Sequence, residues 1–289
     1  MSRRDEDDVK VVSSHGHFVW YELVTTDIAA ATAFYTRVMR WGAWDASTPG
    51  KSYILFGDGK SAISALTPLS NDARQIGVQP TWVGYVGVDD VDAAAERVTQ
   101  LGGTVQVPPT DVADISRFSV FTDPQGARLA LFKWCNPAEQ PLAAPDAAGR
   151  VGWHELLAAD WEQAWIFYAE LFGWQKEEAD DSEAPTYQPF STEGRMIGGM
   201  FTKPPTIPTP FWLCYFNIDD IDAAAQRVTA GGGLVLEGPL ETGGGSWVIQ
   251  CADPQGAAFA LEGPRKRRSP GYFEGAQRTP GGKPCRWSW

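Results

Sequence analysis

Residues 89–99 read DDVDAAAERVT, and residues 219–229 read DDIDAAAQRVT. In each stretch an Asp precedes apolar residues that recur at helical spacing, and Asp is a favoured N-cap because its carboxylate accepts free N–H groups of the first turn. The β-prone run 82–88 comes directly before the first stretch. The pattern predicts a strand followed by a capped helix, and its recurrence indicates that this unit is repeated along the chain.

Further matches extend the repeat in both directions. They occur in the same order in both halves: WYEL at 20–23 and WHEL at 153–156, FY at 34–35 and 167–168, and DPQGA at 123–127 and 253–257. So many ordered matches indicate a tandem duplication. Within the first copy, strand 19–25, cap Asp27 and helix 28–39 precede a second strand and helix at 82–88 and 91–101. Short β-prone runs follow each helix, so the predicted unit is strand–helix–strand–strand–strand, present twice per copy.

The composition is that of a folded protein with two domains. The chain has 289 residues, of which 43% are hydrophobic and 21% charged, with a formal net charge of -12. An acidic chain repels polyanions, so we expect no nucleic-acid partner. No apolar run approaches the roughly 18 residues of a membrane-spanning helix, the charged N-terminus gives no signal peptide, and the cysteines show no CxxC spacing. We therefore expect a cytoplasmic protein with no membrane partner.

The repeat and the local composition predict the domain boundaries. We expect a first domain at 14–136 and a second at 150–264. The segment 137–149 is rich in Pro and Ala, which favours an extended linker. The segment 265–289 opens with four basic residues and is rich in Gly and Pro, so we expect a flexible basic tail. An interaction module built on that tail is a further possibility.

The ordered motifs resemble those of the vicinal oxygen chelate superfamily, the group of glyoxalases, bleomycin resistance proteins and dioxygenases. The resemblance rests on the Asp-capped helices, the Phe-Tyr pairs, Gly173-Trp174 after a helix and the final Asp-Pro-x-Gly turns. It covers about residues 14–135 and 150–263. It implies an α+β fold in which paired βαβββ modules form half-open barrels around a cleft, once per copy. Because this fold carries many activities, it leaves the chemistry open.

The resemblance also implies where a metal ion would bind. Metal-using members carry His, Gln or Glu on the first strand of each module and Glu on the last strand, all facing the cleft. The corresponding residues here are Trp20, Val83 and Ala130 in the first copy, and Trp153, Leu213 and Ala260 in the second. These side chains have no lone pair to offer a metal ion. We therefore predict that the protein uses no metal cofactor.

Strand alternation predicts which side chains face each cleft. In the first copy these are Trp20, Glu22, Tyr85, Arg128 and Phe132, and in the second they are Trp153, Glu155, Tyr215 and Asn217. Aromatic walls favour a planar ligand. A glutamate buried beside Trp would have a raised pKa suited to a general base, which makes Glu22 and Glu155 the candidate catalytic residues. Alternatively, these carboxylates pair with an arginine such as Arg128.

Two further features bear on the clefts. His154 alternates with Glu155 and is expected to lie buried under the helices. Arg128 is replaced by Ala258 in the second copy, and Val24 by Leu157, so the two clefts are not expected to be equivalent.

These residues lead to one main hypothesis and one alternative. The main hypothesis is a metal-independent protein that acts on an aromatic or planar small organic molecule, either as a binder or as an enzyme. The alternative is a metal-dependent lyase or dioxygenase with displaced ligands such as His154 and Glu155. In either case we expect a monomer whose copies pack as an internal pseudo-dimer.

Overall fold

The computed structural model describes residues 14–59, 61–75, 77–136, 146–178, 187–242 and 245–266. Most of the expected linker at 137–149 and of the expected tail at 265–289 lies outside these residues. Arg265, at the start of that tail, donates to both carboxylate oxygens of Asp222 at 2.8 Å and lies over the ring of Trp247. The chain is therefore anchored at Arg265.

The first copy contains the elements β1 (Phe18–Thr25), α1 (Ile28–Met39), β2 (Gly42–Asp45), β3 (Ile54–Gly57), β4 (Ala62–Pro68), α2 (Asn71–Gln75), β5 (Thr81–Gly87), α3 (Val91–Gln100), β6 (Thr104–Val112), β7 (Ser116–Thr122) and β8 (Arg128–Trp134). The second copy contains β9 (Val151–Ala158), α4 (Trp161–Phe172), β10 (Gln175–Lys176), β11 (Tyr187–Thr192), β12 (Arg195–Thr202), β13 (Phe211–Asn217), α5 (Ile221–Ala230), β14 (Leu234–Glu241), β15 (Ser246–Ala252) and β16 (Ala258–Pro264). The short strands β2 and β10 complete the predicted unit, but their positions were not predicted, and the short helix α2 was not predicted.

The predicted helix caps are confirmed. The side chains of Asp27, Asp90, Asp160 and Asp220 each accept a hydrogen bond from a backbone N–H in the first turn of the following helix. Each of these residues has extended backbone angles, as an N-cap requires. The caps fix where the helix begins after the first strand of each module, so each helix returns over one face of the sheet.

Each copy forms one eight-stranded sheet. The orders are β2-β3-β4-β1-β5-β8-β7-β6 and β10-β11-β12-β9-β13-β16-β15-β14. In the first sheet, the two modules meet where β1 pairs antiparallel with β5, and each of these strands has a parallel partner on its other side, β4 and β8. The second sheet repeats this arrangement. The predicted α+β fold of four βαβββ modules is confirmed.

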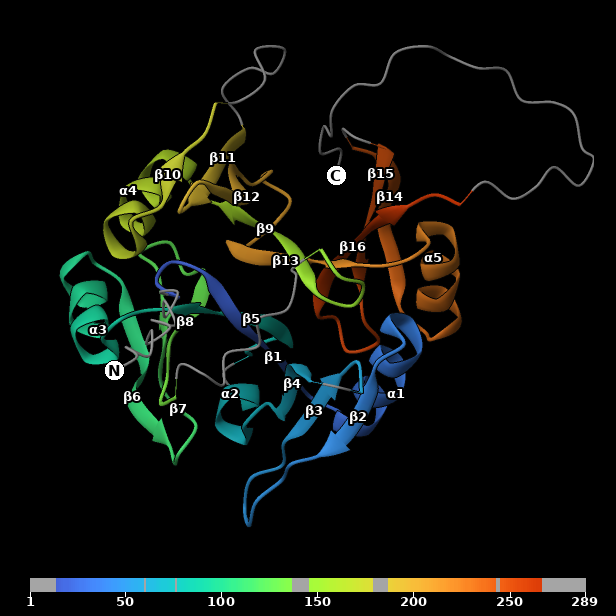
Figure 1. Ribbon diagram of the computed structural model, residues 1–289, viewed down its shortest axis with the longest axis horizontal. Helices are drawn as coiled ribbons and strands as arrows, with labels where there is room; N and C mark the ends of the chain where they lie inside the picture. The colour runs from blue at the N-terminus through green and yellow to red at the C-terminus, as the bar shows by residue number, and fades with distance from the viewer. Residues whose placement is uncertain are drawn as a thin grey trace, which may run out of the picture.

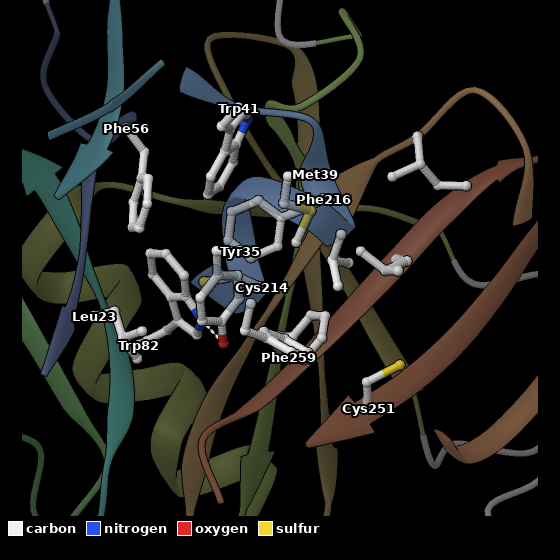
Figure 2. Packing of buried hydrophobic residues seen from close by; sticks show 14 of the residues in the cluster. Leu23, Tyr35, Met39, Trp41, Phe56, Trp82, Cys214, Phe216, Cys251 and Phe259 are labelled. Carbon is white, nitrogen blue, oxygen red and sulfur yellow. Dashed lines mark hydrogen bonds between the residues drawn. The ribbon is translucent and has the colours of Figure 1, made fainter. Parts of the chain in front are cut away.

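The helix-bearing faces of the two sheets share their hydrophobic cores. Helix α1 packs on α5 and helix α3 packs on α4, as Figure 1 shows at opposite sides of the molecule. One cluster joins Tyr35 and Trp82 of the first copy to Phe216 and Phe259 of the second (Figure 2). A second cluster joins the remaining two modules in the same way. The copies therefore pack as the predicted internal pseudo-dimer, with the other face of each sheet left for a cleft.

Reciprocal hydrogen bonds cross this interface. The Tyr35 hydroxyl donates to Asp253 at 3.1 Å, and the Tyr168 hydroxyl donates to Asp123 at 2.9 Å. Asp123 opens the Asp-Pro-Gln-Gly turn, is 4% exposed, and also accepts the backbone N–H of Ala127. The turn motif therefore has a second role that its turn propensity did not predict, because it receives a hydroxyl from the other copy.

No helix within the described parts of the chain is long and apolar enough to cross a membrane.

The crossing hydroxyl groups predict a measurable stability effect. Tyr168→Phe removes a donor to Asp123 and leaves the buried Trp212 Nε1–H, which donates to the Tyr168 hydroxyl at 3.0 Å, without its acceptor. A buried polar group that loses its partner costs about 1–3 kcal/mol, so urea unfolding should show a loss of that size. Thr110→Val, which removes an exposed hydroxyl bonded within its own strand, is the control and should change stability by less than about 0.5 kcal/mol. Equal losses of stability in both variants would contradict a stabilising role for the hydrogen bonds that cross between the copies.

Candidate functional site

The second face of each sheet presents the predicted cleft side chains. Strand pairing places Trp20 opposite Tyr85, and Tyr85 beside Ala130. Glu22 lies opposite Val83 and beside Ala65 of β4. The buried cluster on this face includes Trp20, Tyr85 and Ala130 and is separate from the cores that join the copies. Strand alternation therefore predicted this face correctly.

The side chains at the family's metal positions do not fit a metal ion. In the first copy these positions hold an indole, a valine and an alanine at Trp20, Val83 and Ala130, and the neighbouring strand β4 offers Ala65. No group of three or more His, Cys, Asp and Glu side chains that could hold an ion occurs among the residues that the structure describes. Glu22, between Val83 and Ala65, lies in the same part of the sheet but is turned to other partners.

Glu155 is held by two tyrosines in the second cleft. Tyr187 donates its hydroxyl to Oε1 at 2.9 Å, and Tyr215 donates its hydroxyl to Oε2 at 2.5 Å. Behind them, Trp153 Nε1–H donates to the Tyr187 hydroxyl at 3.0 Å and Gln250 donates to the Tyr215 hydroxyl at 3.1 Å. Glu155 is 9% exposed. The carboxyl group is thus fixed in orientation by a chain of side-chain hydrogen bonds.

The first cleft has the same residue types and one of the same hydrogen bonds. The Tyr53 hydroxyl donates to Glu22 at 3.1 Å. Tyr85 contributes to the electrostatic environment of Glu22, and Trp20 to that of Tyr53. A Glu–Tyr–Tyr–Trp set therefore occurs once in each copy. The pairing of Glu22 with Arg128, which the sequence left open, is not what the structure has.

Three members of these networks were not predicted. Tyr53 and Tyr187 begin the matching patterns Tyr-x-x-Phe, and this internal match was a usable signal that the sequence analysis did not use. Gln250 stands where the first copy has Val120, since both pair with the alanine of the neighbouring strand. The replacement of an apolar residue by a polar one at a repeated position was the signal that could have identified Gln250.

Burial raises the pKa of both glutamates. The pKa of Glu155 rises to about 7, mainly because the ionised carboxylate is removed from water, while the tyrosine hydroxyl groups oppose the shift and nearby Glu262 adds to it. Burial also raises the pKa of Glu22, against the opposing effects of Tyr53 and Lys51. A carboxyl group with a pKa near neutrality is suited to accept and return a proton.

A cavity of about 130 Å³ adjoins the network in the second cleft. Its lining includes Leu157, Leu213, Phe211, Ala258 and Gln250. Leu213 lies opposite Glu155 on the neighbouring strand, and Gln250 bonds to the tyrosine that holds Glu155. An apolar cavity of about 150 Å³ is large enough for benzene, so this smaller one has room for a branched alkyl group or for most of a single small ring.

The other predicted ligand-binding residues take different places. Phe132 is buried against Tyr85, with ring centroids 5.9 Å apart, so it forms part of the cleft wall. Asn217 ends β13 beside Glu262, and its side chain packs over Gly152, where a Cβ atom would lie 2.8 Å from the amide. Arg128 begins β8 on the face of the first cleft and is partly buried.

His154 belongs to the interface between the copies. Its Nε2 lies 2.7 Å from the Tyr21 hydroxyl, its Nδ1 lies 2.7 Å from the Ile197 carbonyl oxygen, and its ring stacks on Phe18. Burial lowers its pKa to about 3, so the ring is neutral. The prediction of a buried, hydrogen-bonded histidine is confirmed. Because it lies on the opposite face of β9 from Glu155, His154 cannot join that residue as a metal ligand.

Two sheets of paired βαβββ modules, each with a Glu, two Tyr and a Trp on the face away from the helices, define a tandem vicinal-oxygen-chelate protein. The chain belongs to the Glyoxalase/Bleomycin resistance protein/Dioxygenase superfamily, whose model matches residues 16–131 and 150–261.

Several known proteins resemble the chain over most of its length. CFP32 of Mycobacterium tuberculosis (strain CDC 1551 / Oshkosh), named provisionally as a glyoxylase, is 33% identical over 247 residues, covering 84% of this chain and 92% of the relative. The anthracycline biosynthesis protein DauV of Streptomyces sp. (strain C5) is 29% identical over 255 residues, covering 84% and 91%.

Solved structures show the same fold at low identity. The 2,3-dioxygenase LapB from Pseudomonas sp. KL28 has a TM-score of 0.62 at 13% identity, covering 90% of this chain and 96% of that one. The Mn(II)-bound glyoxalase from Novosphingobium aromaticivorans has a TM-score of 0.60 at 15% identity, covering 88% and 84%.

The raised pKa of Glu155 predicts how stability depends on pH. The folded protein keeps a proton up to about pH 7 that the unfolded chain releases near pH 4.5, so the free energy of unfolding falls as pH rises between these values. Glu155→Gln cannot lose a proton. The stability of the variant relative to the natural protein should therefore increase by about 1–3 kcal/mol from pH 5 to pH 8, measured by urea unfolding. Glu96→Gln, on the exposed side of α3, should show no such trend; a flat profile for both variants would contradict the burial of a titrating Glu155.

Proposed function

We propose that the protein binds a small organic molecule that carries a compact aromatic or branched apolar group, and that it does so without a metal ion. In the second cleft the apolar group would enter the cavity beside Leu213, and Glu155 would face a donor group of the ligand. The observation that carries this proposal is the Glu–Tyr–Tyr–Trp network, which both copies keep on the cleft face.

The network supports a functional role because a buried carboxyl group stabilises a core less than an apolar side chain would. A buried carboxyl with a pKa near 7 lowers stability at neutral pH, whereas an apolar residue of similar size would not. Both copies keep a buried glutamate although they have diverged elsewhere, which favours a functional role for the carboxyl group. Glu155 can hold a ligand donor group or accept its proton, so the same geometry serves a binder and a metal-independent enzyme.

Two other findings support an aromatic ligand and a metal-free site. The relative DauV carries a name that assigns it to anthracycline biosynthesis, and anthracyclines are aromatic compounds. The side chains at the family's metal positions, such as Trp20 and Ala130, offer no ligand atom for an ion.

Binding of a ring to the second cleft can be tested with ¹⁹F NMR titrations of 4-fluorophenol and fluorobenzene. We expect both probes to bind, with 4-fluorophenol at least threefold tighter because its hydroxyl can donate to Glu155. Leu213→Trp should fill the cavity and abolish this binding, and Glu155→Gln should remove the preference for the phenol. Tyr85→Phe in the first cleft is the matched control and should leave the part of the signal that depends on Leu213 unchanged. Equal binding to the natural protein and to Leu213→Trp would contradict the proposal.

Metal independence has its own test. Protein dialysed against EDTA should bind 4-fluorophenol with unchanged affinity, and added Mn²⁺ should not broaden signals near Glu155. One equivalent per domain of tightly held Fe, Zn, Ni or Mn in the purified protein, lost together with binding, would overturn this part.

We also propose that the chain is a monomer. The helix faces that would pair with a second chain are covered by the other copy, as α1 is by α5. Light scattering should give a mass of 31.5 kDa. Twice that mass would contradict the proposal.

A further inference from the structure

Arg128 is a cation on the cleft face of the first sheet. It lies on the same face of β8 as Ala130 and Phe132, which belong to the buried cluster of that cleft. Its Nε is buried and has no hydrogen-bond partner among the residues that the structure describes. Within the described ranges, none of the ion pairs includes Arg128. Glu22, the carboxylate of the same cleft, is held by tyrosines instead.

The surroundings of Arg128 make this arrangement costly. Arg128 lies two residues before Ala130, which pairs with Tyr85, and Val120 lies diagonally across from Arg128 on β7; Val83 is two residues before Tyr85 on β5. Both valines belong to or pack on the apolar cluster of the cleft. Burial alone accounts for the lowered pKa of the guanidinium, with no acid opposing it. Removing a charge from water without a counter-charge is unfavourable. A neutral side chain at this position of the strand would avoid that cost.

The second copy has removed that charge. Ala258 stands in place of Arg128 and lines the apolar cavity with Leu157 and Leu213. At the other end of the same strand, Glu262 stands in place of Phe132. The first cleft therefore carries a cation, without an ion-pair partner among the described residues, where the second has a neutral cavity and an additional acid.

We propose that the first cleft binds a small organic acid whose carboxylate pairs with Arg128, while the second cleft binds a neutral or cationic group. The guanidinium presents parallel N–H donors that match both oxygens of a carboxylate. Glu22 lies on β1 and Arg128 on β8, the two strands on either side of β5, so their strands are about 10 Å apart at two strand spacings. A carboxylate at Arg128 therefore places the rest of a single-ring ligand against Trp20 and Tyr85. This inference rests on the proposed function only in that the clefts bind small molecules.

The test compares sodium benzoate, cyclohexanecarboxylate and pyruvate with benzamide, the neutral counterpart of benzoate. Affinities for the natural protein and for each variant are measured by isothermal titration calorimetry. In the natural protein, the Arg128 Nε–H signal in ¹H–¹⁵N NMR spectra, assigned by its loss in Arg128→Gln, shows whether the ligand binds at Arg128. We expect at least one carboxylate to shift the Arg128 signal and to bind at least tenfold tighter than benzamide. Arg128→Gln should remove that preference, and Arg128→Lys should retain part of it.

A second measurement needs no ligand. Arg128→Leu should raise the melting temperature of the free protein, because it removes an uncompensated charge. Arg74→Leu is the matched control: Arg74 donates to the carbonyl oxygens of Leu69 and Thr26, so its loss should lower the melting temperature. A lower melting temperature for Arg128→Leu would show that Arg128 supports the fold, and would overturn the proposal.

The outcomes separate this inference from the proposed function. If benzoate and benzamide bind the first cleft equally, in the natural protein and in Arg128→Gln alike, the cleft binds small molecules but has no acid site, and only this inference fails. If no carboxylate shifts the Arg128 signal, the inference is likewise overturned. If 4-fluorophenol does not bind the second cleft of the natural protein while benzoate still shifts the Arg128 signal, the proposed function of the second cleft fails and this inference stands.

Discussion

Packing between the helix-bearing faces of the two sheets is the constraint on which the rest of the structure depends. Each core draws residues from both copies, as the contacts of Trp82 with Phe216 and of Tyr35 with Phe259 illustrate. Because these faces are covered, each sheet has only its other face available for a ligand. The buried hydroxyl–carboxylate pairs, such as Tyr168 with Asp123, fix the register between the copies, since a displacement would leave both groups unpaired.

The two faces of β9 explain the position of the candidate site in the second copy. Glu155 lies on the cleft face of β9, while its neighbour His154 lies on the interface face of the same strand. The interface therefore holds β9 rigidly from behind, where His154 is bonded to Tyr21 of the other copy. A carboxyl held by Tyr187 and Tyr215 on such a strand has little freedom to turn, which is what orienting a ligand or transferring a proton requires.

The sequence predicted those features that depend on local rules. The caps such as Asp27 follow from backbone chemistry, and the cleft positions of Trp20 and Glu22 follow from the two-residue period of a strand. Features that depend on partners distant in the chain were beyond those rules. The role of Asp123 as an acceptor for the other copy, and the bond of Tyr187 to Glu155, required knowledge of which strands become neighbours.

The duplication has separated two kinds of constraint. A change at the shared core, for example at Phe216, disturbs both copies at once, because the same contacts stabilise both. A change on a cleft face disturbs only one sheet, so Arg128 and Ala258 could diverge while the glutamates and tyrosines beside them did not. Divergence at several positions around a glutamate and tyrosines that both copies keep is the pattern expected when two clefts keep one mode of holding a ligand and differ in the ligand's charge.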